Sequence, residues 1–285
     1  MHLTAPDNSP LFDLLIGIAP ESSKTTLRSW VKEGRVAIDG VTASRADTPV
    51  LKGQKVTVSA KPRFAASKVR IVYEDRHLVA IDKPEGMLSV ATAFEKTETA
   101  FGWLKKHYHP RKVYVVHRLD QDTSGVMLFA LSEEGYNGLK ALFAEHDIQR
   151  TYCAVVEGRV IPETGTWQSY LHEDARYHVH SSDDPSEGEL AITHYQVEKQ
   201  SPRYTLLKLM LETGRKNQIR VHCQQCGCPI AGDKKYGAST NSLKRLCLHA
   251  ATLGFIHPVT DKAMSFVSPI PEGFLQLFEK KRKLP

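Results

Sequence analysis

The chain has 285 residues, 41% hydrophobic and 25% charged, which are ordinary values for a soluble globular protein with one large domain or two unequal ones. No apolar run approaches the roughly 20 residues that a membrane-spanning helix needs, so we expect no membrane partner. The amino terminus lacks a basic segment followed by an apolar stretch, and the five cysteines are an odd number, so we expect a cytoplasmic protein with reduced thiols.

Positive charge is concentrated near the amino terminus. Residues 1–70 contain 11 Lys and Arg against 6 Asp and Glu, a net charge of +5, whereas the remaining 215 residues contain 27 against 26, a net charge of +1. A small basic segment beside a nearly neutral body favours contact with a polyanion, because Lys and Arg displace condensed counterions. A basic surface that only maintains solubility is the alternative.

Residues 11–58 are typical of a compact α+β unit. Apolar residues at helical spacing predict one helix from residue 11 to 18, and a second helix and two short strands follow. The second helix carries Lys24, Arg28 and Lys32 at i, i+4 and i+8, which places them in one stripe. We expect this stripe to bind the polyanion, and a solvated helix face is the alternative.

The segment that follows lacks apolar periodicity and contains small, basic and proline residues. We therefore predict a small domain at residues 1–60, a linker at 61–69 and a larger domain at 70–285. In the larger domain, short strands alternate irregularly with three helices, near residues 96–107, 133–146 and 216–226. This pattern favours an α+β fold with a mixed, largely antiparallel sheet over a doubly wound parallel sheet.

Two polar segments of the larger domain stand out. The stretch 172–190 has few apolar residues, which predicts a long mobile loop. A charged, turn-forming block lies between the apolar runs 113–116 and 126–131, and its sequence is His117-Arg118-Leu119-Asp120-Gln121-Asp122-Thr123-Ser124-Gly125. Such a block places polar side chains at the rim of a sheet, where a substrate can reach them. An ordinary hairpin, in which Asp and Ser bond to their own backbone, is the alternative.

This block resembles the His-Arg-Leu-Asp-x-x-Thr-Ser-Gly signature of the RluA-type pseudouridine synthases, and it matches every fixed position. Other segments resemble the family's motifs in the same order, namely Asp82-Lys83-Pro84-Glu85-Gly86, Arg150-Thr151-Tyr152, Thr213-Gly214-Arg215-Lys216-Asn217-Gln218-Ile219-Arg220-Val221-His222, Pro229-Ile230-Ala231-Gly232-Asp233 and Leu248-His249-Ala250. The resemblance covers roughly residues 70–275. It implies the pseudouridine synthase fold, an RNA partner and the isomerisation of uridine to pseudouridine.

The resemblance also implies roles for single residues. Asp120 is the indispensable carboxylate at the ribose, Arg220 is its cationic partner, and Tyr152 stacks on the uracil. Arg118 fills the space that the extruded base leaves. Beside these roles, we expect Lys83 to contact a phosphate. Isomerisation exchanges neither electrons nor groups with solvent, so we expect no cofactor and no metal.

Residues 11–58 resemble the S4 RNA-binding module that often precedes this catalytic domain, which implies RNA contacts for the basic stripe defined above. By analogy, this module favours large-subunit ribosomal RNA as the substrate. We also expect the enzyme to be a monomer. A tRNA substrate is one alternative. A catalytically inactive RNA-binding protein that serves ribosome assembly is another.

The chain departs from the family's pattern at two places. Lys216-Asn217 stands where the family usually has Thr-His, and Glu189 stands where Lys is common. These departures affect the expected RNA contacts. A separate run, His222-Cys223-x-x-Cys226-x-Cys228, is compatible with zinc ligands but lacks a second half at the usual distance.

Overall fold

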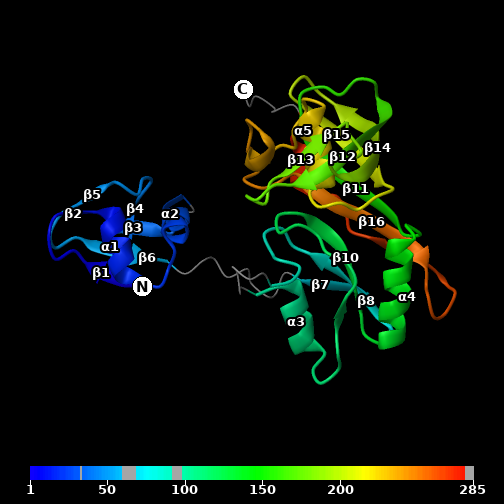
Figure 1. Ribbon diagram of the computed structural model, residues 1–285, viewed down its shortest axis with the longest axis horizontal. Helices are drawn as coiled ribbons and strands as arrows, with labels where there is room; N and C mark the ends of the chain where they lie inside the picture. Colours follow the sequence, from blue (N-terminus) through cyan, green and yellow to red (C-terminus); the bar gives the residue numbers. More distant parts are fainter. Residues whose placement is uncertain (33, 60–68, 92–97, 280–285) are drawn as a thin grey trace, which may run out of the picture. The chain divides into compact units, whose positions relative to one another are not determined.

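The computed structural model describes residues 1–32, 34–59, 69–91 and 98–279 (Figure 1). The chain divides into two compact units, Met1–Arg63 and Phe64–Pro285. Of the expected linker, only Val69 is among the described residues. None of the described helices is both long and apolar enough to cross a membrane.

The first unit is a small α+β fold. Within its described residues, an antiparallel sheet has the strand order β1 (His2–Thr4), β6 (Lys55–Val58), β3 (Val36–Ile38) and β4 (Val41–Thr42), and β2 (Ser9–Pro10) pairs separately with β5 (Pro49–Val50). Helices α1 (Leu11–Ile18) and α2 (Lys24–Lys32) join one apolar core with strand residues such as Val36 and Val56. The helices and strands predicted for residues 11–58 are therefore confirmed.

The second unit is built on one long sheet, which contains eleven strands within the described residues. Their order is β13 (Val179–Ser182), β12 (Thr164–Glu173), β14 (Glu189–Gln200), β15 (Tyr204–Leu211), β11 (Gln149–Glu157), β16 (Leu248–Ile256), β10 (Ser124–Ala130), β8 (Leu78–Lys83) and β7 (Arg70–Glu74); in addition, β17 (Ala263–Val267) pairs with β16 and β9 (Tyr114–Val115) pairs with β10. Among these described pairs, β10 with β16 is the parallel one. The predicted mixed, largely antiparallel sheet is confirmed.

Strand β10 is buried on both faces. Its residues Met127 and Phe129 join a core with α3 (Ala100–His107), whereas Val126 and Leu128 join a core with α4 (Glu133–Ala144). Side chains alternate between the two faces of a strand, so the two helices cover opposite faces of the sheet here (Figure 1). This double cover explains the continuous apolar run after the polar block.

The other end of the sheet is covered by α5 (Gln218–Gln225), which packs on β12, β13 and β14. The short helices η2 (Lys234–Tyr236) and α6 (Glu272–Gln276) follow later in the chain.

The prediction of a long mobile loop at residues 172–190 is wrong. This stretch contains the end of β12, the whole of β13 and the start of β14, and β12 pairs with β13 from Tyr170↔Ser182 to Glu173↔Val179. Strand β13 lies at the edge of the sheet and buries few apolar side chains, chiefly Val179. An edge strand that buries few apolar side chains lacks the apolar alternation from which a strand is predicted, so the pattern of this stretch predicts a loop instead.

Candidate active site

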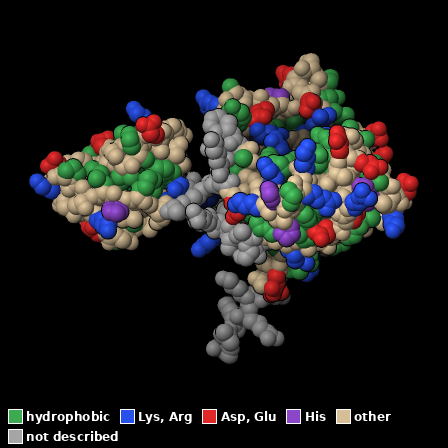
Figure 2. All heavy atoms as spheres, turned by 90° about the horizontal axis from the view of Figure 1, so that it is seen from below, with side chains coloured by type: hydrophobic (Ala, Val, Ile, Leu, Met, Phe, Trp, Pro, Cys, Tyr) green, Lys and Arg blue, Asp and Glu red, His purple; other side chains and the backbone are tan. Residues whose placement is uncertain are grey.

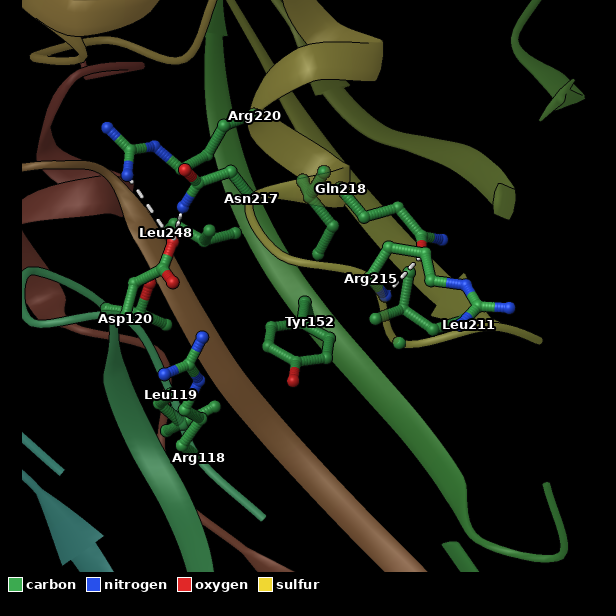
Figure 3. A pocket seen from close by; sticks show the side chains of 13 residues that line it. Arg118, Leu119, Asp120, Tyr152, Leu211, Arg215, Asn217, Gln218, Arg220 and Leu248 are labelled. Atoms are coloured by element: carbon green, nitrogen blue, oxygen red, sulfur yellow. Dashed lines mark hydrogen bonds and ion pairs between the residues drawn. The ribbon is translucent and has the colours of Figure 1, made fainter. Parts of the chain in front are cut away.

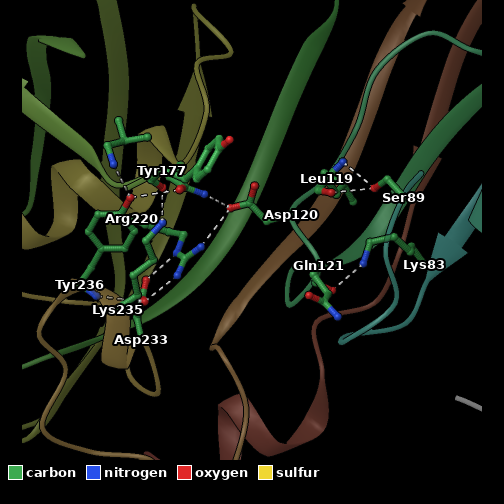
Figure 4. A network of polar contacts seen from close by, with 12 residues as sticks. Lys83, Ser89, Leu119, Asp120, Gln121, Tyr177, Arg220, Asp233, Lys235 and Tyr236 are labelled. Atoms are coloured by element: carbon green, nitrogen blue, oxygen red, sulfur yellow. Dashed lines mark hydrogen bonds and ion pairs between the residues drawn. The ribbon is translucent and has the colours of Figure 1, made fainter. Parts of the chain in front are cut away.

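Asp120 lies in the loop just before β10, and this loop is held on both sides of the carboxylate. Ser89 Oγ donates a hydrogen bond to the Leu119 carbonyl (2.7 Å) and accepts one from the Leu119 N–H (3.1 Å). Lys83 Nζ donates to the Gln121 carbonyl (3.0 Å). These contacts fix the backbone at the two neighbours of Asp120, so its side chain projects from a defined position (Figure 4).

The phosphate contact expected of Lys83 is contradicted. The side chain is 0% exposed, and Nζ donates to the carbonyls of Pro84 (3.0 Å), Met87 (2.8 Å) and Gln121 (3.0 Å). These three bonds use the three donors of an ammonium group. Burial lowers the pKa of Lys83 to about 7, and nearby carboxylates oppose this shift. Lys83 therefore fastens the loop that carries Asp120.

Arg220, on α5, joins two carboxylates. Its Nε and Nη2 donate to the two oxygens of Asp233 (2.7 and 2.8 Å), and its Nη1 donates to Asp120 Oδ2 (3.3 Å). Burial opposes the positive charge, but the Asp233 and Asp120 carboxylates raise the pKa of Arg220 above its ordinary value. The structure thus brings Arg220 and Asp120 together as expected. It also shows that Asp233, whose side chain is 1% exposed, orients the guanidinium.

Asn217 makes the shortest contact with Asp120, and sequence reasoning assigned it no role. Its Nδ2 donates to Asp120 Oδ2 (2.6 Å), and its Oδ1 accepts from the Tyr236 hydroxyl (3.0 Å). Asn217 occupies the N-cap position of α5 with a left-handed backbone (φ 54°), and its side chain makes no capping bond. Asn tolerates this conformation better than most residues. The departure from the family's His at this position was the available signal.

The amide orientation of Asn217 follows from its two partners. An ionised Asp120 can only accept hydrogen bonds, so the Nδ2 group must face it. The Tyr236 hydroxyl can donate to the oxygen on the other side. The network therefore favours one orientation of the amide for an ionised Asp120.

The two oxygens of Asp120 differ in their contacts. Both Arg220 and Asn217 bind Oδ2, whereas Oδ1 has no hydrogen-bond partner among the described residues. The side chain is 30% exposed and lines an open pocket with about 460 Å³ of empty volume. One oxygen is thus fixed by the protein, and the other is available to a ligand.

Tyr152, on β11, lines the same pocket, together with Leu211 and Arg215 (Figure 3). Burial raises the pKa of Tyr152 above its ordinary value, the Arg150 cation opposes this shift, and Asp120 adds to it. The side chain therefore stays a neutral phenol at pH 7. It offers the pocket an aromatic face without a second negative charge.

Arg118 also lines the pocket, and its side chain is exposed. The structure records no hydrogen bond or ion pair between Arg118 and another described residue. Its guanidinium is therefore available to a substrate. The structure thus places Arg118, Asp120, Tyr152 and Arg220 around one pocket and excludes Lys83 from it.

The basic stripe of the first unit is partly described. Lys24 and Arg28 lie exposed on α2, and the Arg28 guanidinium stacks over the Phe12 ring at 4.8 Å from the centroid. The side chain of Lys32 lies outside the described residues.

The loop before α5 is held by Gln218. Its Oε1 accepts hydrogen bonds from the Thr213 hydroxyl (2.8 Å) and the Arg215 N–H (2.9 Å), and its Nε2 donates to the Ile192 carbonyl (2.9 Å). The departing residue Glu189 forms an ion pair with Arg215 (3.1 Å). Acidic Glu189 thus serves to hold a basic residue at the pocket.

The zinc alternative finds no support in the ligand geometry. The two ring nitrogens of His222 lie within hydrogen-bond distance of the hydroxyls of Ser169 (3.1 Å) and Thr193 (2.9 Å), and burial lowers the pKa of His222 to about 4. Across residues 1–32, 34–59, 69–91 and 98–279, no group of three or more His, Cys, Asp or Glu side chains is arranged to hold a metal ion.

Comparisons with solved structures show which known fold the chain shares. The chain is similar to the human RNA pseudouridylate synthase domain containing 4 protein, with a TM-score of 0.60, 24% identity, and coverage of 72% of this chain and 90% of the other. The human RNA pseudouridylate synthase domain containing 1 protein gives a TM-score of 0.62 at 22% identity, with 74% and 86% coverage. At these identities the similarity establishes a shared fold.

Sequence comparisons give the family. Residues 77–225 match the family described as RNA pseudouridylate synthase. The Bacillus subtilis protein named uncharacterized RNA pseudouridine synthase YlyB is 33% identical, with 92% of this chain and 90% of the relative covered. Ribosomal large subunit pseudouridine synthase D of Pseudomonas aeruginosa is 32% identical, with 93% and 89% covered. The chain belongs to the RNA pseudouridylate synthase family.

Proposed function

We propose that this RNA pseudouridine synthase modifies uridines of large-subunit ribosomal RNA and that Asp120 carries the reaction. The observation that carries the role of Asp120 is the asymmetric setting of its carboxylate. Asn217 and Arg220 hold Oδ2, and Oδ1 is open to the pocket that Tyr152 lines.

The reaction breaks the bond between N1 and C1′, turns the uracil, joins C5 to C1′ and moves the proton of C5 to N1. Two routes use a carboxylate at the ribose. Asp120 attacks C1′ and leaves again when C5 bonds to that carbon, or it removes the C2′ proton and returns it after C5 has added to C1′. Both routes need an anionic oxygen beside the sugar, and Oδ1 is the oxygen without a partner within the described protein.

The neighbouring side chains serve the same step. Arg220 stays charged because Asp233 binds it, so it can compensate the negative charge of Asp120 throughout the reaction. Tyr152 stacks on the uracil, and its phenol relays the C5 proton.

The target nucleotide must leave its stack before its ribose can reach Asp120. Extrusion of a base costs a few kcal/mol, and inserted or stacked side chains offset this cost. Arg118 is exposed at the pocket and is long enough to occupy the vacated space.

Two observations support ribosomal RNA as the substrate. Several relatives with about 32% identity carry the name ribosomal large subunit pseudouridine synthase D. The first unit also carries exposed basic residues on α2, and we propose that residues 1–60 form an S4-like RNA-binding domain, joined by residues 61–69 to a catalytic domain at 70–285.

The experiment that tests this proposal maps pseudouridines in ribosomal and transfer RNA from cells with and without the gene. We expect sites in large-subunit ribosomal RNA to disappear and to return when the purified chain is added to unmodified transcript. Loss of sites in tRNA alone would refute the ribosomal substrate. Loss of no site, with no activity on transcripts, would favour an RNA-binding assembly factor.

A further inference from the structure

A second groove lies beside the pocket of Asp120. It is open, has about 910 Å³ of empty volume, and shares Arg220 with that pocket. Three exposed lysines line it: Lys234 and Lys235 on η2, and Lys244 in the loop that leads to β16. We refer to it as the lysine groove.

The loop that forms one wall of the lysine groove is held in place. Glu157 accepts hydrogen bonds from the backbone and hydroxyl groups of Ser239 and Thr240. Gly232 has φ +85° and packs so closely on the Arg245 carbonyl that a Cβ would lie 2.0 Å from its oxygen. The two ends of the loop are thus fixed against each other, which brings Lys234 and Lys244 to one groove.

The lysine groove has an excess of positive charge. Its lining holds five cations and three carboxylates, a net charge of +2. Arg220 and Arg245 are already paired, with Asp233 and Glu85 respectively. The remaining charges are the three lysines and the exposed Asp122.

The lysines themselves are only partly engaged. Lys235 Nζ donates to the Tyr177 carbonyl (2.8 Å), and burial together with the Arg220 and Lys216 cations lowers its pKa. The structure records no hydrogen bond or ion pair of Lys234 or Lys244 with other described residues. Figure 2 shows Lys and Arg side chains around a hollow on one face of the larger unit.

We infer that the lysine groove binds the phosphodiester backbone of the RNA strand that flanks the target uridine. This inference rests on the proposed function, because it places the target nucleotide at Asp120. A strand whose nucleotide enters that pocket must continue beyond it, and the groove is its neighbour because Arg220 lines both. Lys234 and Lys244 then act as point charges for phosphates, without reading the sequence.

The test compares two double variants with the same change in net charge. Lys234→Ala/Lys244→Ala removes the free lysines of the groove and leaves Lys235 in place. Lys140→Ala/Lys199→Ala removes two exposed lysines from α4 and β14 of the same unit and serves as the control. Affinity is measured for a short oligouridylate and for a large-subunit rRNA stem–loop across a salt series, with thermal unfolding to check the fold.

We expect the groove variant to bind about tenfold more weakly at low salt. Its plot of log affinity against log salt should be less steep by about 1.4 to 1.8, since each lost phosphate contact removes about 0.7 to 0.9. The control should resemble the wild type. At saturating RNA, kcat of the groove variant should be unchanged while KM rises.

Trimming the stem–loop locates the contact. Removal of the nucleotides on the side of the target uridine that occupies the groove should abolish the difference in affinity between wild type and groove variant. Removal of the nucleotides on the other side should leave that difference in place. Equal binding by both double variants, or a difference that survives trimming on both sides, would overturn the inference. The binding measurement does not depend on turnover. If the enzyme modified no ribosomal RNA, the proposed function would be refuted, but the affinity comparison would still decide whether the lysine groove binds RNA.

Discussion

The contact between Asn217 and Asp120 predicts how activity and stability separate in two variants of one residue. Asn217→Gly removes the amide and keeps a residue that adopts φ 54° without strain. Asn217→Ala removes the amide and also strains the left-handed backbone. The two variants therefore lose the same hydrogen bond but differ in backbone energy.

The structure sets the magnitudes. A 2.6 Å bond to a carboxylate is charge-assisted, and loss of such a bond costs about 1.5 to 3 kcal/mol. If this bond holds Asp120 in its reactive position, the rate should fall about 10- to 150-fold in both variants. Asn217→Ala should in addition lower the free energy of unfolding by about 1 kcal/mol relative to Asn217→Gly.

The assay is the single-turnover rate of pseudouridine formation with saturating protein, combined with RNA affinity and chemical denaturation. Asn137→Ala, at an exposed asparagine on α4, is the control. A rate within about threefold of the wild type in Asn217→Gly would refute the positioning role. A rate loss in Asn217→Ala alone would show that backbone strain, and not the amide, is responsible.

Three further predictions concern stability and RNA affinity. Burial, with a contribution from Arg150, lowers the pKa of His117 to about 3, and its Nε2 accepts a bond from a backbone N–H of β10 (2.8 Å). The unfolded chain takes up this proton near pH 6.5 and the folded chain only near pH 3, so the free energy of unfolding should fall on acidification by up to about 1.4 kcal/mol per pH unit between these values. His117→Gln should lack this part of the decline in denaturation measured from pH 7 to 5, and an identical pH dependence would contradict the reasoning. Gly125→Ala should destabilise the protein by about 3 kcal/mol or more, because φ is +114° and a Cβ would lie 2.1 Å from a carbonyl oxygen of β16; a loss below about 1 kcal/mol by denaturation would be inconsistent with this packing. Lys24→Ala/Arg28→Ala should weaken ribosomal RNA binding and flatten its salt dependence, and unchanged affinity across a salt series would count against an RNA-binding role of α2.

The parts of the fold that sequence reasoning found are those with strong local signals. The polar block around Asp120 is flanked by a strand that is apolar on both faces, and the structure places this block at the rim of the sheet. The pairing of Asp120 with Arg220 came from the family resemblance. The helices of the first unit came from apolar spacing, which their shared core confirms.

The parts that sequence reasoning missed depend on contacts between distant residues. Asn217 and Asp120 are 97 positions apart, and no local pattern reports their hydrogen bond. The expected phosphate contact of Lys83 was wrong because its sequence neighbours do not reveal that three carbonyls enclose its ammonium group. Strand β13 was missed because it pairs at the edge of the sheet with few apolar residues.

The most direct test of the role of Asp120 removes the negative charge of its side chain and keeps the shape of that side chain. Asp120→Asn and the control Asp261→Asn, in the turn between β16 and β17, remove one negative charge each. The measurement is single-turnover pseudouridine formation on large-subunit ribosomal RNA, with RNA affinity determined in parallel. We expect Asp120→Asn to bind RNA but form no pseudouridine, while Asp261→Asn keeps the wild-type rate. A near wild-type rate in Asp120→Asn would contradict the account.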